Sequence, residues 1–187
     1  NSSAASDVYK RQVETLTGTF TELKQYITDQ AQYTSKNGIT TVTIDAQAID
    51  GAGGRGSVAE LITFHTDIRD TGDGFNANAV INLTNVDLLS GGVSDLLSAI
   101  SLTDITGISG TDIALTATDA SISIANANNL SGATSGVVTA TITESTIAQI
   151  LDAGDGLNTD GGANAFTIDI SNTCLLYTSP SPRDLRK

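Results

Sequence analysis

Six short segments of the chain alternate apolar and polar residues, which is the pattern of a β-strand with one buried face. In the last three segments the apolar positions are Ile, Leu, Val, Ala or Phe, and the positions between them are mostly Thr. Threonine suits an exposed strand face because its branched side chain packs well on a pleated surface. The six expected strands are Thr15–Phe20, Thr40–Asp45, Ala79–Thr84, Ile113–Thr118, Val137–Ile142 and Ala165–Ile170.

Helical patterns lie between these strands. Ser57 and Glu60 have the spacing of a capping box, in which each side chain binds a free backbone N–H of the other residue. An apolar stripe with helical spacing follows, made of Val58, Leu61, Ile62, His65 and Ile68. Shorter stripes predict helices near Leu23–Ile27, Val93–Ile100 and Ser145–Leu151. The pattern in Ser121–Leu130 is weaker, and this segment could be either helical or irregular.

The order of these elements predicts a repeat architecture. The expected strands begin at residues 15, 40, 79, 113, 137 and 165, and short helical connections between strands favour parallel pairing. Each unit is too small to bury its own apolar face, whereas stacked units can share one core. We therefore expect an α/β repeat, a solenoid with a parallel β-sheet and short helices between the strands. The alternative is a compact α/β sandwich, which would need longer strands that are hydrophobic on both faces.

The two ends of the chain differ from its middle. Asp7–Gln12 and Cys174–Asp184 resemble in-frame translations of an adapter used in sequencing libraries, one in each orientation. We expect residues 1–12 and 174–187 to be adapter artefacts, and residues 13–173 to be a repeat solenoid fragment of metagenomic origin. The alternative is a natural basic linker and a natural Ser/Pro tail. Residues 13–173 contain 19 acidic and four basic residues, a net charge of −15, and no cysteine.

This composition bears on partners. Strong acidity disfavours binding to nucleic acid, because few basic side chains can displace counterions from phosphates, and it disfavours adhesion to anionic lipid. No run approaches the roughly 20 apolar residues of a membrane-spanning helix. The absence of cysteine from residues 13–173 excludes disulfides and thiolate metal sites there. We therefore expect no nucleic-acid partner and no membrane insertion in this segment.

Three segments between residues 111 and 171 carry a family resemblance. Asp112–Asp119, Ser123–Ala127 and Gly136–Thr143 resemble repeats of giant bacterial surface proteins, including adhesin-like proteins and marine cyanobacterial cell-surface proteins linked to motility. The resemblance covers about residues 38–173. It implies a secreted structural or adhesive module, located outside the cell or on its surface. It also implies neighbouring repeats of the same chain as partners, with a cell-surface glycan or other surface as a possible target.

Two similar loops are candidate calcium sites. Both follow a helical stretch and precede a strand, and their oxygen-bearing residues are Asp70, Asp73 and Asn76 in the first loop and Asp152, Asp155, Asn158 and Asp160 in the second. Calcium prefers six to eight oxygen ligands, and some proteins of the resembled kind carry calcium-binding arrays. The loops lack the Glu of an EF-hand and the haemolysin-type nonapeptide pattern. They could instead be plain helix-ending turns that bind no ion. Calcium is the one cofactor that the sequence suggests.

Other candidate chemistry has a simpler structural explanation. The Gly-rich segment Gly51–Gly56 precedes a helix and could hold phosphate, but it lacks the P-loop Lys and more readily makes a flexible connection. His65 is the single histidine and lies on an apolar stripe, so we expect a packing residue. Paired carboxylates could hydrolyse a polysaccharide, or cleave it by elimination if Arg55 or Arg69 stabilised the developing negative charge. We nevertheless expect the chain not to be an enzyme.

Repeated Thr-x-Thr sequences suggest a further alternative. They occur at Thr41–Thr43, Thr116–Thr118 and Thr139–Thr141, on expected outward faces. Flat rows of this type resemble ice-binding solenoids, but ordinary strand chemistry is the simpler explanation, and only three of the six expected strands carry the sequence. The preferred function is thus a structural or adhesive repeat module, with calcium as a candidate stabilising ion. The alternatives are an ice-, glycan- or other lattice-binding solenoid and a carbohydrate-active enzyme.

Overall fold

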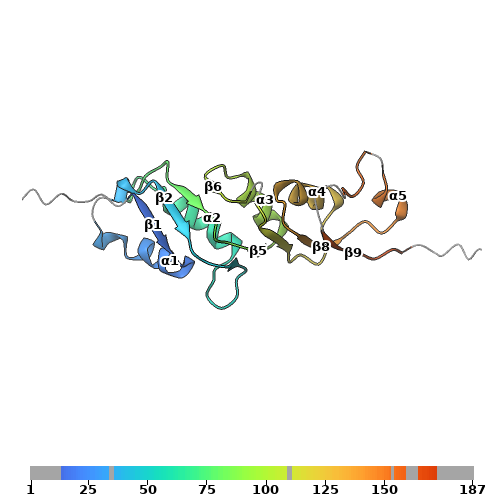
Figure 1. Cartoon of the computed structure of the whole chain (residues 1–187), viewed down its shortest axis with the longest axis horizontal. Coiled ribbons are helices and arrows are strands. Elements are labelled where there is room, and N and C mark those ends of the chain that lie inside the picture. Colours follow the sequence, from blue (N-terminus) through green and yellow to red (C-terminus); the bar gives the residue numbers. More distant parts are fainter. Residues whose placement is uncertain (1–13, 34–35, 109–110, 153, 159–163, 172–187) are drawn as a thin grey trace, which may run out of the picture.

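The computed structural model describes residues 14–33, 36–108, 111–152, 154–158 and 164–171. These residues form an α/β fold of two parallel sheets and short helices (Figure 1). The chain progresses along the long axis from its N-terminal to its C-terminal part, although neighbouring elements overlap along this axis. Strand β1 (Thr15–Gly18) and helix α1 (Phe20–Thr28) lie toward one end, and helix α5 (Ile147–Ile150) and strand β9 (Ala165–Ile168) lie toward the other.

All strand pairs within the two sheets are parallel. The first sheet has the order β1-β2-β4-β6, with β2 at Thr41–Ile44, β4 at Val80–Asn82 and β6 at Ile105–Thr106. The second sheet has the order β3-β5-β7-β8-β9, with β3 at Ala48–Ile49, β5 at Leu88–Gly91, β7 at Ala114–Ala117 and β8 at Val138–Ile142. Within each sheet the strands therefore stand in chain order.

The prediction of parallel strands with short helices is confirmed, and the fold is also consistent with the α/β sandwich. Each of the six expected segments contains a strand, but the first three lie in the first sheet and the last three in the second. The expectation of one sheet was wrong because β3 and β6 have two residues each, too few to show alternation. Phe20 begins α1 instead of ending β1, since Thr19 caps that helix.

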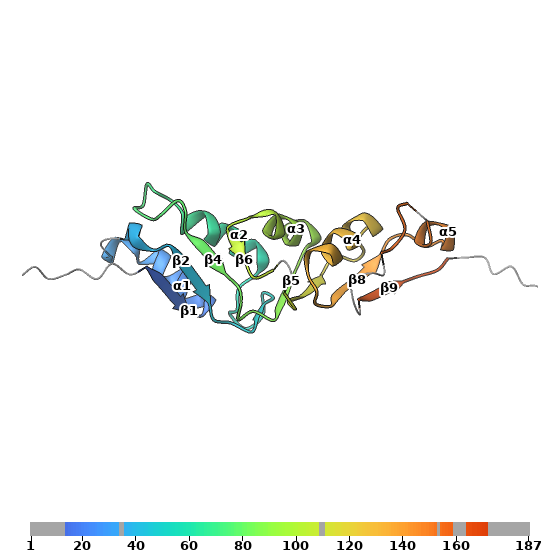
Figure 2. The ribbon, with the colours of Figure 1, turned by 45° about the horizontal axis from the view of Figure 1, so that its top comes forward.

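The helices begin where the sequence places their caps. Helix α2 (Val58–Asp67) has the predicted capping box of Ser57 and Glu60. The weak segment after residue 121 forms a ten-residue helix, α4 (Ile124–Ala133), because the Ser123 side chain accepts the N–H of Asn126. Helix α2 packs on α3 (Val93–Ser101), and α3 packs on α4. Helices α2, α3 and α4 lie in a row along one side of the molecule (Figure 2).

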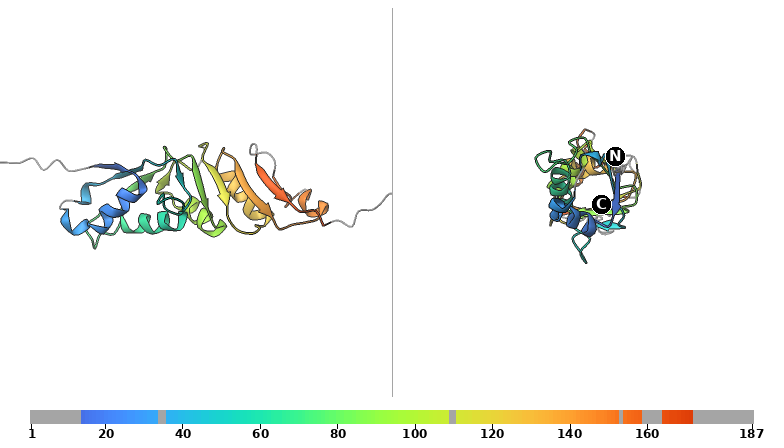
Figure 3. Two further views of the ribbon diagram at one scale, coloured as in Figure 1. Left: turned by 90° about the horizontal axis from the view of Figure 1, so that it is seen from below. Right: turned by 90° about the vertical axis from the view of Figure 1, so that its left-hand side faces the viewer.

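The core runs continuously from one end of the described chain toward the other. Val42, Ile81 and Ile105 form one buried row across three neighbouring strands of the first sheet. Across the second sheet, the strand pairing of β5, β7 and β8 builds a second buried row. Seen along the long axis, the backbone runs around a common centre (Figure 3). The buried apolar side chains form one cluster. Consecutive strands and helices therefore bury their apolar faces against one another.

Candidate functional site

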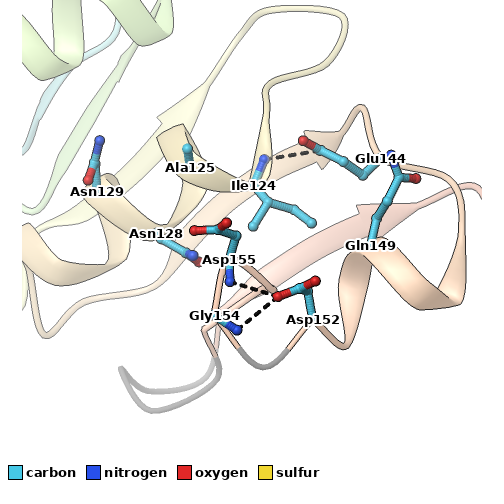
Figure 4. Close-up of a pocket in the computed structure, with 9 residues that line it drawn as sticks. All are labelled: Ile124, Ala125, Asn128, Asn129, Glu144, Gln149, Asp152, Gly154 and Asp155. Carbon is cyan, nitrogen blue, oxygen red and sulfur yellow. Dashed lines mark hydrogen bonds between the residues drawn. The ribbon is translucent and has the colours of Figure 1, made fainter.

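A hollow of about 460 Å³ lies beside α4, α5 and the second candidate calcium loop. Figure 4 shows polar side chains from these elements lining it together. The lining residues are Ile124, Ala125, Asn128, Asn129, Glu144, Gln149, Asp152, Gly154 and Asp155. Six of these nine carry a carboxylate or an amide side chain. The hollow therefore combines carboxylate and amide side chains that could bind a cation or a hydroxyl-bearing ligand.

Backbone hydrogen bonds fix the carboxylates of this hollow. Glu144 Oε2 accepts the N–H of Ile124 at 3.0 Å, at the beginning of α4. Asp152 Oδ1 accepts the N–H of Gly154 at 2.8 Å and that of Asp155 at 3.1 Å. These two bonds, the one from Gly154 first, hold the pKa of Asp152 below its ordinary value. Asp152 is thus an anchored carboxylate that stays ionised at neutral pH.

Asn128 ties the second loop to helix α4. Its Nδ2 donates to the carbonyl oxygen of Gly156 at 2.9 Å, and its Oδ1 accepts the N–H of Asn158 at 2.8 Å. The loop is therefore held against the helix at two points. Asp160, the remaining predicted ligand of this loop, lies outside the described residues. The structure brings Asp152 and Asp155 together at one hollow and adds Glu144, which the sequence pattern did not single out.

The chemistry of the hollow follows from its charges. Glu144, Asp152 and Asp155 would attract cations and accept hydrogen bonds from hydroxyl groups, and no Lys, Arg or His is among the residues that line it. The arginines considered for polysaccharide cleavage are engaged elsewhere. Arg55 forms two bonds to the Asp50 carboxylate, at 3.0 and 2.6 Å. The hollow thus provides carboxylates, but its lining lacks a basic side chain that could stabilise the negative charge formed in an elimination reaction.

The second arginine belongs to a separate cluster. Arg69 Nη2 lies 3.0 Å from Asp104 Oδ2, and Arg69 Nη1 donates to the carbonyl oxygen of Ala79 at 2.6 Å. These contacts join the end of α2 to the starts of β4 and β6. Arg69 therefore acts in the described chain as a link between elements.

The first candidate calcium loop directs its oxygens to three separate partners. Asp70 Oδ1 accepts the N–H of Gly72 at 2.7 Å, Asp73 Oδ2 accepts Nε2 of Gln30 at 2.7 Å, and Asn76 Oδ1 accepts the N–H of Asn78 at 2.9 Å. The contacts of this loop are those of a helix-ending turn. Across the described ranges, no group of three or more His, Cys, Asp or Glu residues is arranged to hold a metal ion. Calcium binding at either loop stays a prediction.

His65 occupies the packing position expected of it. Its side chain is 12% exposed, and Nε2 lies 3.8 Å from Asp104 Oδ2, beyond hydrogen-bonding distance. Burial, followed by the nearby positive charge of Arg69, lowers the pKa of His65, and Asp104 only partly opposes this. The imidazole is therefore a buried neutral group at neutral pH.

The Gly-rich segment forms a turn that a backbone hydrogen bond closes. The N–H of Gly51 donates to the carbonyl oxygen of Gly56 at 2.7 Å, which closes the loop. Its glycines at positions 51, 53, 54 and 56 all have positive φ, a conformation that glycine adopts at little cost. The Gly54 carbonyl oxygen accepts a hydrogen bond from the Thr21 hydroxyl at 2.5 Å. Its contacts attach the loop to α1.

The Thr-x-Thr sequences are divided between the two sheets. Thr41 and Thr43 lie in the first sheet, whereas Thr116 and Thr139 are paired neighbours in the second. One row of the first sheet is polar in all four strands, and its members in register are Thr17, Thr43, Asn82 and Thr106. An ordered polar row therefore exists, although the three predicted pairs do not share one face.

Two carboxylates that the sequence reasoning missed cap helices belonging to earlier parts of the chain. Asp119 Oδ2 accepts the N–H of Val93 at 2.6 Å, at the beginning of α3, where the N-cap Gly92 has no side chain to offer. Glu144 does the same for α4. Each carboxylate stands two residues after the end of a second-sheet strand. That shared position is the sequence signal that could have identified them.

Within the described ranges, the structure contains no helix that is both long and apolar enough to cross a bilayer. No family model, curated protein or solved structure matches the chain.

Proposed function

We propose that this chain is a structural and adhesive repeat module of a secreted bacterial surface protein, built as a solenoid of stacked units. A unit here means one or two strands together with the helix that follows them. The observation that carries the proposal is the parallel, chain-ordered pairing of strands in both sheets. Stacking of this kind creates a long surface and a continuous core from small units. Such a scaffold could hold other parts of a surface protein away from the cell, or it could offer a long surface for binding.

Contacts between successive units support this architecture at three levels. Strands join units through backbone hydrogen bonds, and neighbouring helices α2, α3 and α4 pack side by side. The carboxylates of Asp119 and Glu144 cap the helices of preceding units. Each of these contacts lies between neighbours along the chain. Stability would then be the sum of unit terms and nearest-neighbour interface terms.

Hydrogen exchange under native conditions tests the solenoid. Stacked units open most readily at their ends, so we expect amide protection to be greatest in β4 to β7 and to decrease toward both β1 and β9. A compact sandwich would instead unfold as one cooperative block, with equal protection in the sheets. Uniform opening free energies across both sheets would therefore contradict the solenoid.

The adhesive role needs a binding experiment. Beads coated with the folded chain should retain purified bacterial surface polysaccharide or whole cells, and beads coated with heat-unfolded chain should not. The Asp155→Asn variant, which alters the hollow, shows whether retention involves this site. Equal retention by folded and unfolded chain would argue against adhesion and leave only the structural role.

Calcium stabilisation is a separable part of the proposal, and the second loop is the better candidate because Asp152 and Asp155 line the same hollow as Glu144. A ligand that binds only the folded state stabilises it by mass action. We expect CaCl₂ to raise the melting temperature of the chain above that in MgCl₂ of equal ionic strength. The Asp152→Asn, Asp155→Asn double variant should lose this difference, and the Asp70→Asn, Asp73→Asn control should keep it. Equal melting temperatures in the two salts would rule out a specific calcium site.

One observation favours a second candidate, a lattice binder. The polar row of Thr17, Thr43, Asn82 and Thr106 repeats at the spacing of paired strands, about 4.8 Å. An ordered surface such as ice could match that spacing. Ice-recrystallisation inhibition by the chain, abolished in Thr17→Arg and kept in Ser101→Arg on helix α3, would support this candidate. No inhibition by the unaltered chain would remove it.

A further inference from the structure

We propose that the chain polymerises head to tail, with the free edge of β9 pairing in parallel with the free edge of β1 in a second copy. This inference rests on the solenoid proposed above and names the surface through which it would continue. The two strands lie at opposite ends of the molecule (Figure 1). In the described part of the chain, β1 pairs only with β2, and β9 pairs only with β8.

The new contact would repeat the parallel strand pairing that the molecule already uses, and it would join the second sheet of one copy to the first sheet of the next. Every pairing step within the two sheets joins parallel strands in chain order, so β9 offers the next strand the same edge that β8 offers to β9. Strand β1 offers the opposite edge, the one that a preceding strand would occupy. An unpaired edge of this kind readily accepts a strand from another chain.

The side chains of β1 and β9 also match. Both strands have four residues, and both alternate exposed and half-buried positions in the same order. Pairing them in register places Thr167 beside Thr17 on the exposed face. The same register places Phe166 beside Leu16 on the inner face, where both side chains are half-buried. The polar and apolar rows of one copy would thus continue into the next.

Uncovered apolar side chains mark the β9 end. Leu151 is 73% exposed, Ile147 is 51% exposed and Ile170 is 41% exposed. Helices α2 and α3 are each covered by the next helix, whereas α5 is followed by no described helix that could cover it. A docked second copy would provide that cover.

The charge distribution favours head-to-tail contact over contact between like ends. Residues 70–171 contain twelve acidic residues and no Lys or Arg, whereas residues 14–69 contain seven acidic and four basic residues. Two β9 ends would therefore repel each other more strongly than a β9 end and a β1 end. Because both ends still have net negative charge, added salt should promote the contact by screening repulsion.

The consequence is an open assembly. A heterologous contact between two different surfaces generates a ring if its rotation closes and a filament if it does not. Each added copy would again present a free β9 edge, so the expected product is a filament whose length increases with protein concentration and with ionic strength.

Site-directed cross-linking of the full-length chain tests the contact. In a Cys174→Ser background, the Thr17→Cys, Thr167→Cys variant should give a ladder of oligomers with a short bismaleimide. The matched control pairs Thr167→Cys with Thr43→Cys, which lies in the same row as Thr17 but in the interior strand β2. The control should give no ladder. A dimer from either single-cysteine variant alone would show contact between like ends and would overturn the proposal.

Sedimentation measurements provide the second arm. The average mass of the unaltered chain should rise between 20 and 500 mM NaCl, as expected for screening over a Debye length that shrinks below about 10 Å. The Ile170→Ser and Leu151→Ser variants should associate several-fold less than Val137→Ser, which alters a side chain 40% exposed on the residue before β8, a strand in the interior of the second sheet. A chain that stays monomeric at all salt concentrations would refute polymerisation. Graded hydrogen exchange in that monomer would leave the solenoid proposal intact.

Discussion

His65 gives the folded chain a pH dependence of stability close to neutral pH. Its pKa is lowered from the ordinary value of 6.5 by burial and by the charge of Arg69, with Asp104 opposing. As pH falls below about 6.5 the unfolded chain takes up a proton that the folded chain resists, so stability is lost. The contribution of neutral His65 to the free energy of unfolding is therefore complete above about pH 6.5. It decreases as the pH falls, until His65 in the folded chain also becomes protonated.

The His65→Gln variant tests this dependence. Urea unfolding at pH 7.5, 6.5 and 5.5 should show a free energy of unfolding that falls with pH in the unaltered chain and changes much less in the variant. The carboxylates whose pKa values are lowered, among them Glu60 and Asp152, act at lower pH, below about 4.5. Equal pH dependence in the two proteins between pH 7.5 and 5.5 would contradict this assignment.

Gly56 is required for two separable physical reasons. Its φ is +79°, and a Cβ at this position would lie 2.0 Å from Cδ1 of Phe20. Gly53 has a φ of +59° but no atom within 4 Å of such a Cβ. Gly53→Ala should therefore cost only the backbone strain, about 1–2 kcal/mol. Gly56→Ala should cost about 1–3 kcal/mol more from overpacking against the buried ring. Equal losses in the two variants, measured by urea unfolding, would show that the contact with Phe20 is unimportant.

At the scale of elements, Asp119 connects a strand of one unit to the helix of the unit before it. Its carboxylate accepts the N–H of Val93 and faces the positive end of the α3 dipole. Asp119→Ala should lower the free energy of unfolding by about 1 kcal/mol, the usual cost of a lost N-cap. Asp87→Ala removes an exposed carboxylate that makes no helix cap and is the matched control. Losses of the same size in both variants would count against the role of this cap.

The success of prediction from the sequence varied with the length of the element. Strand β8 has five residues, and its alternation of Val, Thr, Ala, Thr and Ile is unambiguous. Strand β3 has two buried residues, so no period can be read from it, and the division of the strands into two sheets was missed. Helix α4 lacks a clear apolar stripe because Asn and small residues fill most of it, so only its Ser123 cap could identify its start.

The candidate site was harder to predict than the fold. Loop composition placed Asp152 and Asp155 correctly as neighbours, since they are close in the sequence. Glu144 joins them only because β8 and α5 bring distant segments together at the hollow. The different partners of Asp70 and Asp73 likewise depend on contacts between elements, which a local pattern does not contain.

At the scale of the whole molecule, self-repulsion opposes folding. The chain has a formal net charge of −12, and the three ion pairs of Lys and Arg found among the described residues involve only residues 24–104. Raising NaCl from 20 to 500 mM should therefore raise the melting temperature, because screening weakens repulsion in the compact state more than in the expanded one. Calorimetry at dilute protein concentration measures this. A melting temperature that decreases with NaCl would show that the ion pairs outweigh the repulsion.

Within residues 14–171, every Lys and Arg lies before position 70, and this gives the rod an electrical polarity. Beside a negatively charged surface, the acidic end after position 70 would be repelled more strongly than the end bearing Lys24 and Lys36. Molecules held near such a surface would therefore stand upright with a common orientation. In a layer of such molecules, the carboxylate-rich ends would be exposed to solvent.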